Sequence, residues 1–167
     1  MPTEALGSDG RWILLVEDNA YDEALTLRAF RKSGLEPYIV VARDGVEALN
    51  RMESAAGGAK TPTTADSASG IRASLPRLVL LDLQLPRIDG FEVLRRLRAR
   101  PATRLLPVVI LSSSLEREDL ATSYALGANS YIRKPVDFAE FTVTAAQLGV
   151  YWLGLNQPCL PLTGLGS

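Results

Sequence analysis

The chain has 167 residues, of which 47% are hydrophobic, enough to form the core of one domain. Its 18 basic and 19 acidic residues give a net charge of −1, which does not indicate binding to nucleic acid or to an anionic membrane surface. The absence of histidine and the single Cys159 exclude an internal disulfide, histidine-ligated zinc, and Ser-His or Cys-His nucleophile pairs. Neither a signal peptide nor an apolar stretch of membrane-spanning length is visible, so we expect a cytoplasmic protein.

Short apolar runs alternate with segments of helical periodicity along the chain. After a polar stretch over residues 1–10, which we expect to be loose, the first apolar run covers 12–16 and the first helical segment 21–33. The later apolar runs cover 38–42, 78–82, 107–112 and 130–133, and the later helical segments begin at residue 46 and cover 90–100, 117–126 and 137 to about 155.

This alternation predicts an α/β fold with a doubly wound, five-stranded parallel sheet that carries helices on both faces. We place the domain at residues 11–150 and a C-terminal extension at 151–167. Residues 54–76 are rich in Ser, Thr, Ala and Gly, and we interpret them as a flexible surface insertion in the domain. An ordered regulatory loop is the alternative for this segment.

Charged or hydroxyl side chains stand where four of the five predicted strands end. Glu17 and Asp18 follow the first strand, Asp82 ends the third, Ser112 ends the fourth and Lys134 follows the fifth. Right-handed crossovers bring the carboxyl ends of parallel strands to one edge of a sheet, so we expect these side chains to meet. Clustered carboxylates repel one another and suit Mg²⁺, while a lysine and a hydroxyl can bind phosphoryl oxygens. The sequence therefore predicts a site built around one carboxylate nucleophile.

Each of these residues also has an ordinary structural explanation. Asp82 could cap the turn before Pro86, and the Glu17-Asp18 pair could cap the helix that follows. Ser112 and Lys134 could be solvated loop residues. The prediction of a site depends on their coincidence at separate strand ends.

The sequence resembles the receiver domain of two-component response regulators over roughly residues 11–150. The resemblance implies the flavodoxin-like fold of five βα units. The motifs that carry it are, in chain order, Val16-Glu17-Asp18-Asn19, Leu80-Leu81-Asp82-Leu83-Gln84-Leu85-Pro86, Asp89-Gly90, Ile110-Leu111-Ser112 and Lys134-Pro135.

The resemblance also implies a role for each residue of the predicted site. Asp82 would accept a phosphoryl group from the histidine of a sensor kinase, and Lys134 and Ser112 would bind its oxygens. The chain would promote only its own phosphorylation and dephosphorylation, so we do not expect an enzyme in the usual sense. Mg²⁺, with Mn²⁺ or Ca²⁺ as substitutes, would be held by Glu17, Asp18, Asp82 and the backbone carbonyl of Gln84.

Ser112 and Tyr131 would form the family's conformational switch, in which the hydroxyl moves toward the phosphoryl group and the ring fills the vacated space. An ordinary half-buried strand tyrosine is the alternative for Tyr131. By the same resemblance, the Lys134–Pro135 peptide bond is expected to be cis.

The last helical segment is more apolar than one packed face requires. We expect a homodimer formed by the last helix and the C-terminal tail; a tail folded over its own domain is the alternative. The expected interface residues are Phe141, Leu148, Trp152 and Leu155.

Within this extension, Tyr151-Trp152-Leu153 and Leu160-Pro161 resemble the extension of the single-domain regulators paired with bacterial phytochromes. This resemblance implies a phytochrome histidine kinase as partner. No second domain follows the receiver in this sequence, so we expect signalling through protein contacts rather than DNA binding.

Other functions fit the sequence less well. A phosphohydrolase of the haloacid dehalogenase type needs an acid two residues after its nucleophile, where this chain has Gln84. A nucleotide-binding protein would carry a Gly-rich loop after the first strand, and none is present. A degenerate receiver that serves only as a docking module stays as the alternative. The joint presence of Glu17, Asp18, Asp82, Ser112 and Lys134 argues against it, although Glu17 and Ser112 stand where Asp and Thr are frequent in the family.

Overall fold

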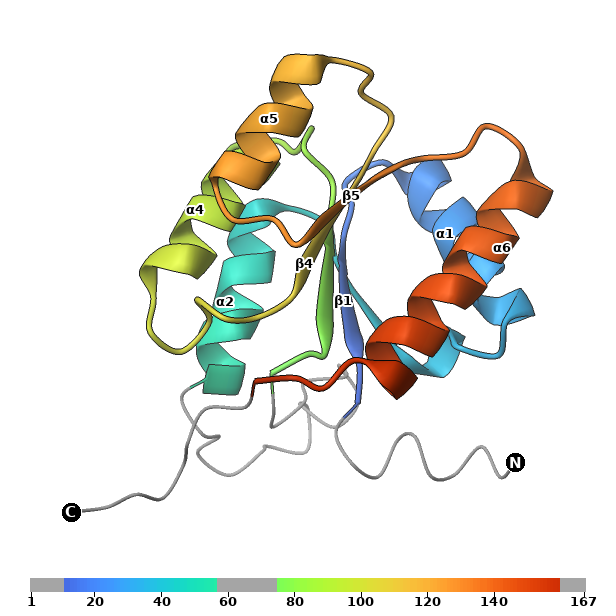
Figure 1. Ribbon diagram of the computed structural model, residues 1–167, viewed down its shortest axis with the longest axis horizontal. Helices are drawn as coiled ribbons and strands as arrows, with labels where there is room; N and C mark the ends of the chain where they lie inside the picture. The colour runs from blue at the N-terminus through green and yellow to red at the C-terminus, as the bar shows by residue number, and fades with distance from the viewer. Residues whose placement is uncertain (1–10, 57–74, 160–167) are drawn as a thin grey trace.

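The structure is a computed structural model that describes residues 11–56 and 75–159 (Figure 1). The expected loose N-terminus, most of the expected insertion and the end of the C-terminal extension lie outside the described residues. No helix in the described part of the chain combines the length and the apolarity that crossing a membrane requires.

Five parallel strands form a single sheet, as the apolar runs predict, and the structure gives their order as β2-β1-β3-β4-β5. The three central strands are buried along their whole length because helices cover both faces of the sheet. The strands are β1 (Ile13–Val16), β2 (Ile39–Ala42), β3 (Leu78–Leu81), β4 (Val108–Ser112) and β5 (Ser130–Arg133).

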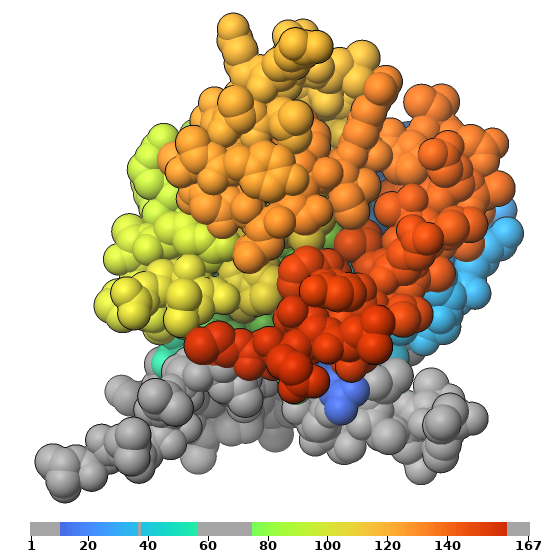
Figure 2. All heavy atoms as spheres, in the orientation of Figure 1, coloured from blue at the N-terminus to red at the C-terminus, as the bar shows by residue number. Residues whose placement is uncertain are grey.

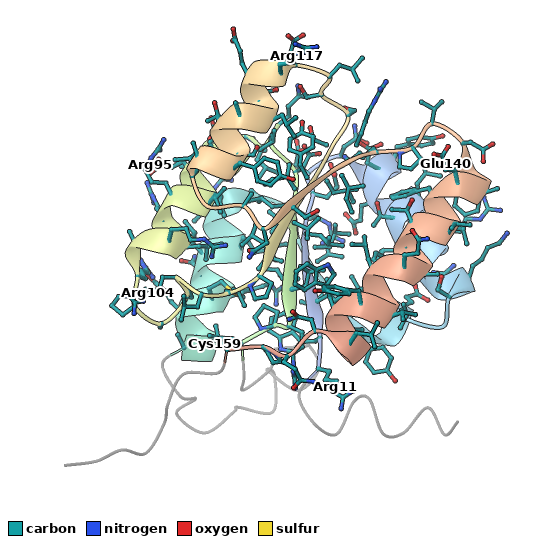
Figure 3. All side chains as sticks on the ribbon, in the orientation of Figure 1. Arg11, Arg95, Arg104, Arg117, Glu140 and Cys159 are labelled. Atoms are coloured by element: carbon teal, nitrogen blue, oxygen red, sulfur yellow. The ribbon has the colours of Figure 1, made fainter. Side chains whose placement is uncertain are left out.

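The register of the sheet aligns the carboxyl ends of neighbouring strands. Val16 pairs with Leu81 across β1 and β3, and Ser112 pairs with Arg133 across β4 and β5. The residues that follow β1, β3 and β5 therefore leave the sheet at the same edge. In Figure 3, Arg117 and Glu140 lie toward this edge, and Arg11 and Cys159 lie at the opposite one.

Helices cover the sheet in two layers, and Figure 1 shows the division. Helices α1 (Ala20–Lys32) and α6 (Phe138–Gly149) lie on one face, and α2 (Gly45–Ala56), α4 (Gly90–Ala99) and α5 (Arg117–Ala125) lie on the other. Each face has its own apolar cluster, one centred on Leu14, Val79 and Leu94 and the other on Leu15, Leu80 and Phe30. The predicted doubly wound α/β fold is confirmed.

Side-chain caps explain where several of these helices begin. Asn19 accepts hydrogen bonds from the backbone N–H groups of Tyr21 and Asp22, both at 3.0 Å, and starts α1. Asp89 and Asp137 cap α4 and α6 in the same way.

Two predicted boundaries need correction. Helix α2 continues to Ala56, so residues 54–56 belong to it and not to the insertion. The second strand begins at Ile39 because Glu36–Tyr38 form a 3-10 turn, η2, with Pro37 at its start.

The last helix continues from α6 into a π-helical segment, η3 (Val150–Leu155). It therefore ends where the sequence predicts, at about residue 155. Phe141 and Leu148 are buried in this chain's own core, because the residues spaced three and four apart face the sheet. Trp152 packs against the same core, whereas Leu155 is 66% exposed. The expected interface is therefore wrong for Phe141 and Leu148, which have no free surface to offer a second copy.

Candidate functional site

Asp82 follows β3 directly and is held by the backbone around it. Its own N–H donates to the carbonyl of Val16 at 3.1 Å, and the N–H of Gln84 donates to its Oδ1 at 3.1 Å. Its side chain is only 10% exposed. The other carboxylate oxygen, Oδ2, is the one that Lys134 contacts.

Lys134 joins three carboxylates at the edge of the sheet. Its Nζ lies 2.7 Å from Glu17 Oε2, 2.8 Å from Asp82 Oδ2 and 3.0 Å from Asp22 Oδ2. The backbone N–H of Lys134 donates to the carbonyl of Ser112 at 2.8 Å, which fixes the point where β5 ends. The predicted meeting of residues from separate strand ends is confirmed for Glu17, Asp82 and Lys134.

The charges at this site alter two ionisation equilibria. Burial raises the pKa of Glu17 to about 7, and its hydrogen bond with Asp82 acts in the same direction against the opposing effect of Lys134. Burial also opposes the charged form of Lys134, but hydrogen bonds and charges from Asp82 and Glu17 outweigh it and raise the pKa of the lysine. Near neutral pH the lysine is therefore a fixed cation beside Asp82, while Glu17 is close to its titration midpoint.

The carboxylates of Glu17, Asp22 and Asp82 form a group that suits a divalent metal ion. Each contributes an oxygen, and these oxygens all lie within 4.8 Å of one another. Hard oxygen ligands of this kind are those that Mg²⁺ and Mn²⁺ take in proteins. Asp18, by contrast, is exposed and is not a member of this group, so its role as a ligand stays a prediction, as does that of the Gln84 carbonyl.

Sequence reasoning missed Asp22. The residue lies in the first turn of α1, three residues after the cap Asn19, and not at a strand end. Placing the helix start at Asn19 would have brought this carboxylate to the edge where β1 finishes.

The two predicted switch residues contact the same loop residue. Ser112 is buried at the end of β4, and its Oγ accepts a hydrogen bond from the N–H of Ser114 at 3.2 Å. The hydroxyl of Tyr131, on the half-buried strand β5, donates to the carbonyl of Ser114 at 3.4 Å. The Ser114 hydroxyl in turn donates to Asp119 at 2.5 Å, and this hydrogen bond links the loop to α5, which no motif in the sequence indicates.

The expected cis bond is wrong. The described residues contain no cis peptide bond, so the Lys134–Pro135 bond is trans. The lysine reaches the carboxylates from the end of β5 with this ordinary geometry.

A buried aspartate, flanking acids, a lysine and a hydroxyl at the carboxyl edge of this sheet define a phosphoryl-accepting receiver domain. The response regulator receiver domain family matches residues 13–146, and the chain belongs to this family. Phosphoryl acceptance is the function of the family, and its members bind Mg²⁺ or Mn²⁺.

Individual relatives extend over most of the chain. The probable methanogenesis regulatory protein FilR2 of Methanothrix harundinacea is 39% identical over 145 residues, which cover 87% of this chain and 85% of FilR2. The response regulator Rcp1 of Synechocystis is 30% identical, covering 84% of this chain and 88% of Rcp1, and its Mn²⁺-bound structure matches with a TM-score of 0.69. The phosphorylated cyanobacterial phytochrome response regulator RcpA matches with a TM-score of 0.72 at 33% identity, over 89% of this chain and 97% of RcpA.

Proposed function

We propose that Asp82 accepts a phosphoryl group from the phosphohistidine of a sensor histidine kinase. The observation that carries this proposal is the contact of 2.8 Å between Asp82 and Lys134 in a nearly buried carboxylate cluster. A carboxylate kept out of water beside a fixed cation is poised to attack an anionic electrophile.

The reaction moves one phosphoryl group between two side chains. An oxygen of Asp82 attacks phosphorus, the bond to the kinase histidine breaks, and its electron pair returns to the imidazole. Lys134 offsets negative charge on a phosphoryl oxygen, and Ser112 donates to another once its hydroxyl turns toward the site. Water later cleaves the acyl phosphate, which restores the aspartate and releases phosphate. The chain promotes both steps on itself.

A bound divalent ion would neutralise charge on the phosphoryl oxygens during transfer. Glu17 and Asp82 would hold it, with Asp18 and the carbonyl of Gln84 as the further expected ligands. The carboxylate oxygens of Glu17, Asp22 and Asp82, which lie within 4.8 Å of one another, support the binding of a hard divalent ion here.

This chain offers the kinase an exposed apolar surface beside the acceptor. Tyr21 is 71% exposed next to Asp22 in the sequence, and Val136 is fully exposed two residues after Lys134. Exposed apolar side chains that border a charged centre are typical of contact surfaces between proteins. A phytochrome kinase is the partner we propose, supported by the similarity to Rcp1 and RcpA. We also propose that the protein is cytoplasmic, because histidine kinases take their phosphoryl group from ATP, which is a cytoplasmic substrate.

We also propose a homodimer through the outward side of the last helix. Val143, Val150, Tyr151 and Leu155 are all exposed there, and Figure 2 shows α6 and η3 on the near face of the molecule. This surface takes the place of Phe141 and Leu148, the expected interface residues that are buried in the core. The net charge of −1 gives no support to a nucleic-acid partner, so we propose that the output passes through protein contacts.

Intact-protein mass spectrometry after treatment with acetyl phosphate and Mg²⁺ tests the function. We expect one phosphoryl adduct in the wild type, none in Asp82→Asn, and none when EDTA removes the metal. Glu118→Gln removes an exposed acid from α5 and serves as the matched control, with a normal adduct expected. If the wild type acquires no phosphoryl group from either acetyl phosphate or a phosphorylated histidine kinase, the docking-module alternative holds instead.

A further inference from the structure

The ammonium group of Lys134 has no free hydrogen-bond donor in this structure. An ammonium carries three N–H donors, and Nζ lies within hydrogen-bond distance of three carboxylate oxygens. To donate to a phosphoryl oxygen on Asp82, the lysine must give up one of these contacts. Which contact it gives up will affect the rate of transfer.

Asp22 is the partner that Lys134 can release at the lowest cost. Its contact is the longest of the three, at 3.0 Å, and its side chain is 34% exposed, against 2% for Glu17 and 10% for Asp82. A carboxylate that reaches water can be rehydrated when the lysine leaves, whereas a buried one cannot. Asp22 also lies on α1 and not on the sheet, so its release leaves the strand ends unchanged.

The negative charge of Asp22 affects two equilibria in opposite directions. It adds attraction for a divalent cation at the neighbouring carboxylates, since all three oxygens lie within 4.8 Å. It also repels the anionic phosphoryl donor and competes with it for Lys134. Removing this charge should therefore weaken metal binding and accelerate phosphoryl transfer.

We propose that Asp22 is a positioning residue that holds Lys134 in the unphosphorylated site and slows phosphorylation while strengthening divalent-cation binding. This inference rests on the proposed transfer to Asp82. Asp22 lies on α1, outside the strand ends, and its effect on the phosphorylation rate is opposite to its effect on cation affinity.

The test compares wild type with Asp22→Asn in two separate measurements. Calorimetric titration with Mg²⁺ alone should give a dissociation constant raised by roughly threefold to tenfold in the variant. At saturating Mg²⁺, the rate of phosphorylation by acetyl phosphate should rise by roughly threefold to tenfold. A purely structural defect would lower both the Mg²⁺ affinity and the phosphorylation rate. A lower affinity together with a higher rate therefore identifies the positioning role of Asp22. A lower rate in Asp22→Asn, or an unchanged metal affinity, would overturn the proposal.

Two further variants make the test specific. Glu118→Gln also removes one negative charge from the helix that follows β4 and should leave both values within about twofold of wild type. In a Lys134→Ala background, Asp22→Asn should lose most of its rate gain, because no lysine remains to be released. A gain of the same size in that background would show that Asp22 acts by charge alone and not through Lys134.

Because Mg²⁺ binding is measured without a phosphoryl donor, the two possible failures can be told apart. A wild type that binds Mg²⁺ but never becomes phosphorylated contradicts the proposed function. If the wild type is phosphorylated but Asp22→Asn does not combine weaker Mg²⁺ binding with faster phosphorylation, only the proposed role of Asp22 is contradicted.

Discussion

Glu17 links the charge of the site to the pH dependence of the fold. Its pKa rises to about 7 because the carboxyl group is buried beside Asp82. Between the ordinary value of about 4.5 and this raised value, the folded protein holds a proton that the unfolded chain has released. Stability contributed by this group is therefore present at low pH and is lost as the pH rises through that window.

We predict that the metal-free protein loses unfolding free energy, on the order of 3 kcal/mol, as the pH rises from about 4.5 to 7. Urea unfolding in EDTA at several pH values measures this change. Glu17→Gln carries no titrating group at this position, so its stability should change much less over the same range. An equally steep loss in the variant would assign the effect to other groups.

Mg²⁺ should reverse this trend, because it binds the ionised carboxylates. We predict that added Mg²⁺ stabilises the protein more at about pH 8 than at about pH 5, where Glu17 is protonated. Thermal unfolding with and without the metal at the two pH values measures the difference. Equal stabilisation at both would argue against Glu17 as a ligand.

At the scale of secondary-structure elements, the start of α4 fixes the loop that carries Asp82. The N–H of Gly90 donates to the carbonyl of Leu83 at 2.9 Å. A Cβ on Gly90 would lie 2.2 Å from the carbonyl oxygen of Asp82 and 2.7 Å from the Cα of Leu83. Both atoms belong to the backbone, so the loop would have to move.

Gly90→Ala should therefore cost about 1–3 kcal/mol of unfolding free energy and slow phosphorylation by displacing the acceptor. Urea unfolding and the acetyl phosphate assay measure the two effects. Gly154→Ala, where the added Cβ meets nothing within 4 Å, is the matched control and should change stability by less than about 0.5 kcal/mol. A fully active, stable Gly90→Ala would contradict this account of the loop.

Arg98 joins α4 to the loops at the other edge of the sheet. Its guanidinium donates to the carbonyls of Leu106 and Gly127 and to the side chain of Asn129, at 2.8 to 3.0 Å. Arg98→Met should lower the unfolding free energy by about 2–4 kcal/mol, because these acceptors lose a charged donor. Arg96→Met removes only an exposed pair with Glu92 and should cost less than about 1 kcal/mol in the same urea experiment.

At the scale of the whole molecule, the order of elements and the acceptor edge could be predicted from the sequence. Buried parallel strands have continuous apolar runs, and their ends must meet at one edge, so Glu17, Asp82 and Lys134 could be grouped without coordinates. Asp22 could not be grouped with them in this way, since its position depends on where α1 begins and how it turns. Phe141 and Leu148 were assigned to the wrong surface because a helical stripe does not indicate whether its own sheet or a second copy covers it.

The outward side of α6 and η3 supports a prediction about assembly. Leu155→Glu places a charge on a side chain that is 66% exposed in the single chain, so folding should be unaffected. If this side forms the homodimer, the variant should sediment as a monomer at concentrations where the wild type is dimeric. Leu115→Glu, which alters an exposed leucine before α5, should stay dimeric. An unchanged assembly in Leu155→Glu would move the interface elsewhere.

The assignment of Asp82 as the phosphoacceptor is best tested by an experiment that identifies the phosphorylated residue. Borohydride reduces an aspartyl phosphate to homoserine, which marks the acceptor permanently for tandem mass spectrometry of the digested protein. After phosphorylation with Mg²⁺ and acetyl phosphate, we predict homoserine at position 82 and unmodified aspartate at positions 18 and 22. Homoserine at either of those other positions, or at none, would contradict the assignment of Asp82 as the phosphoacceptor.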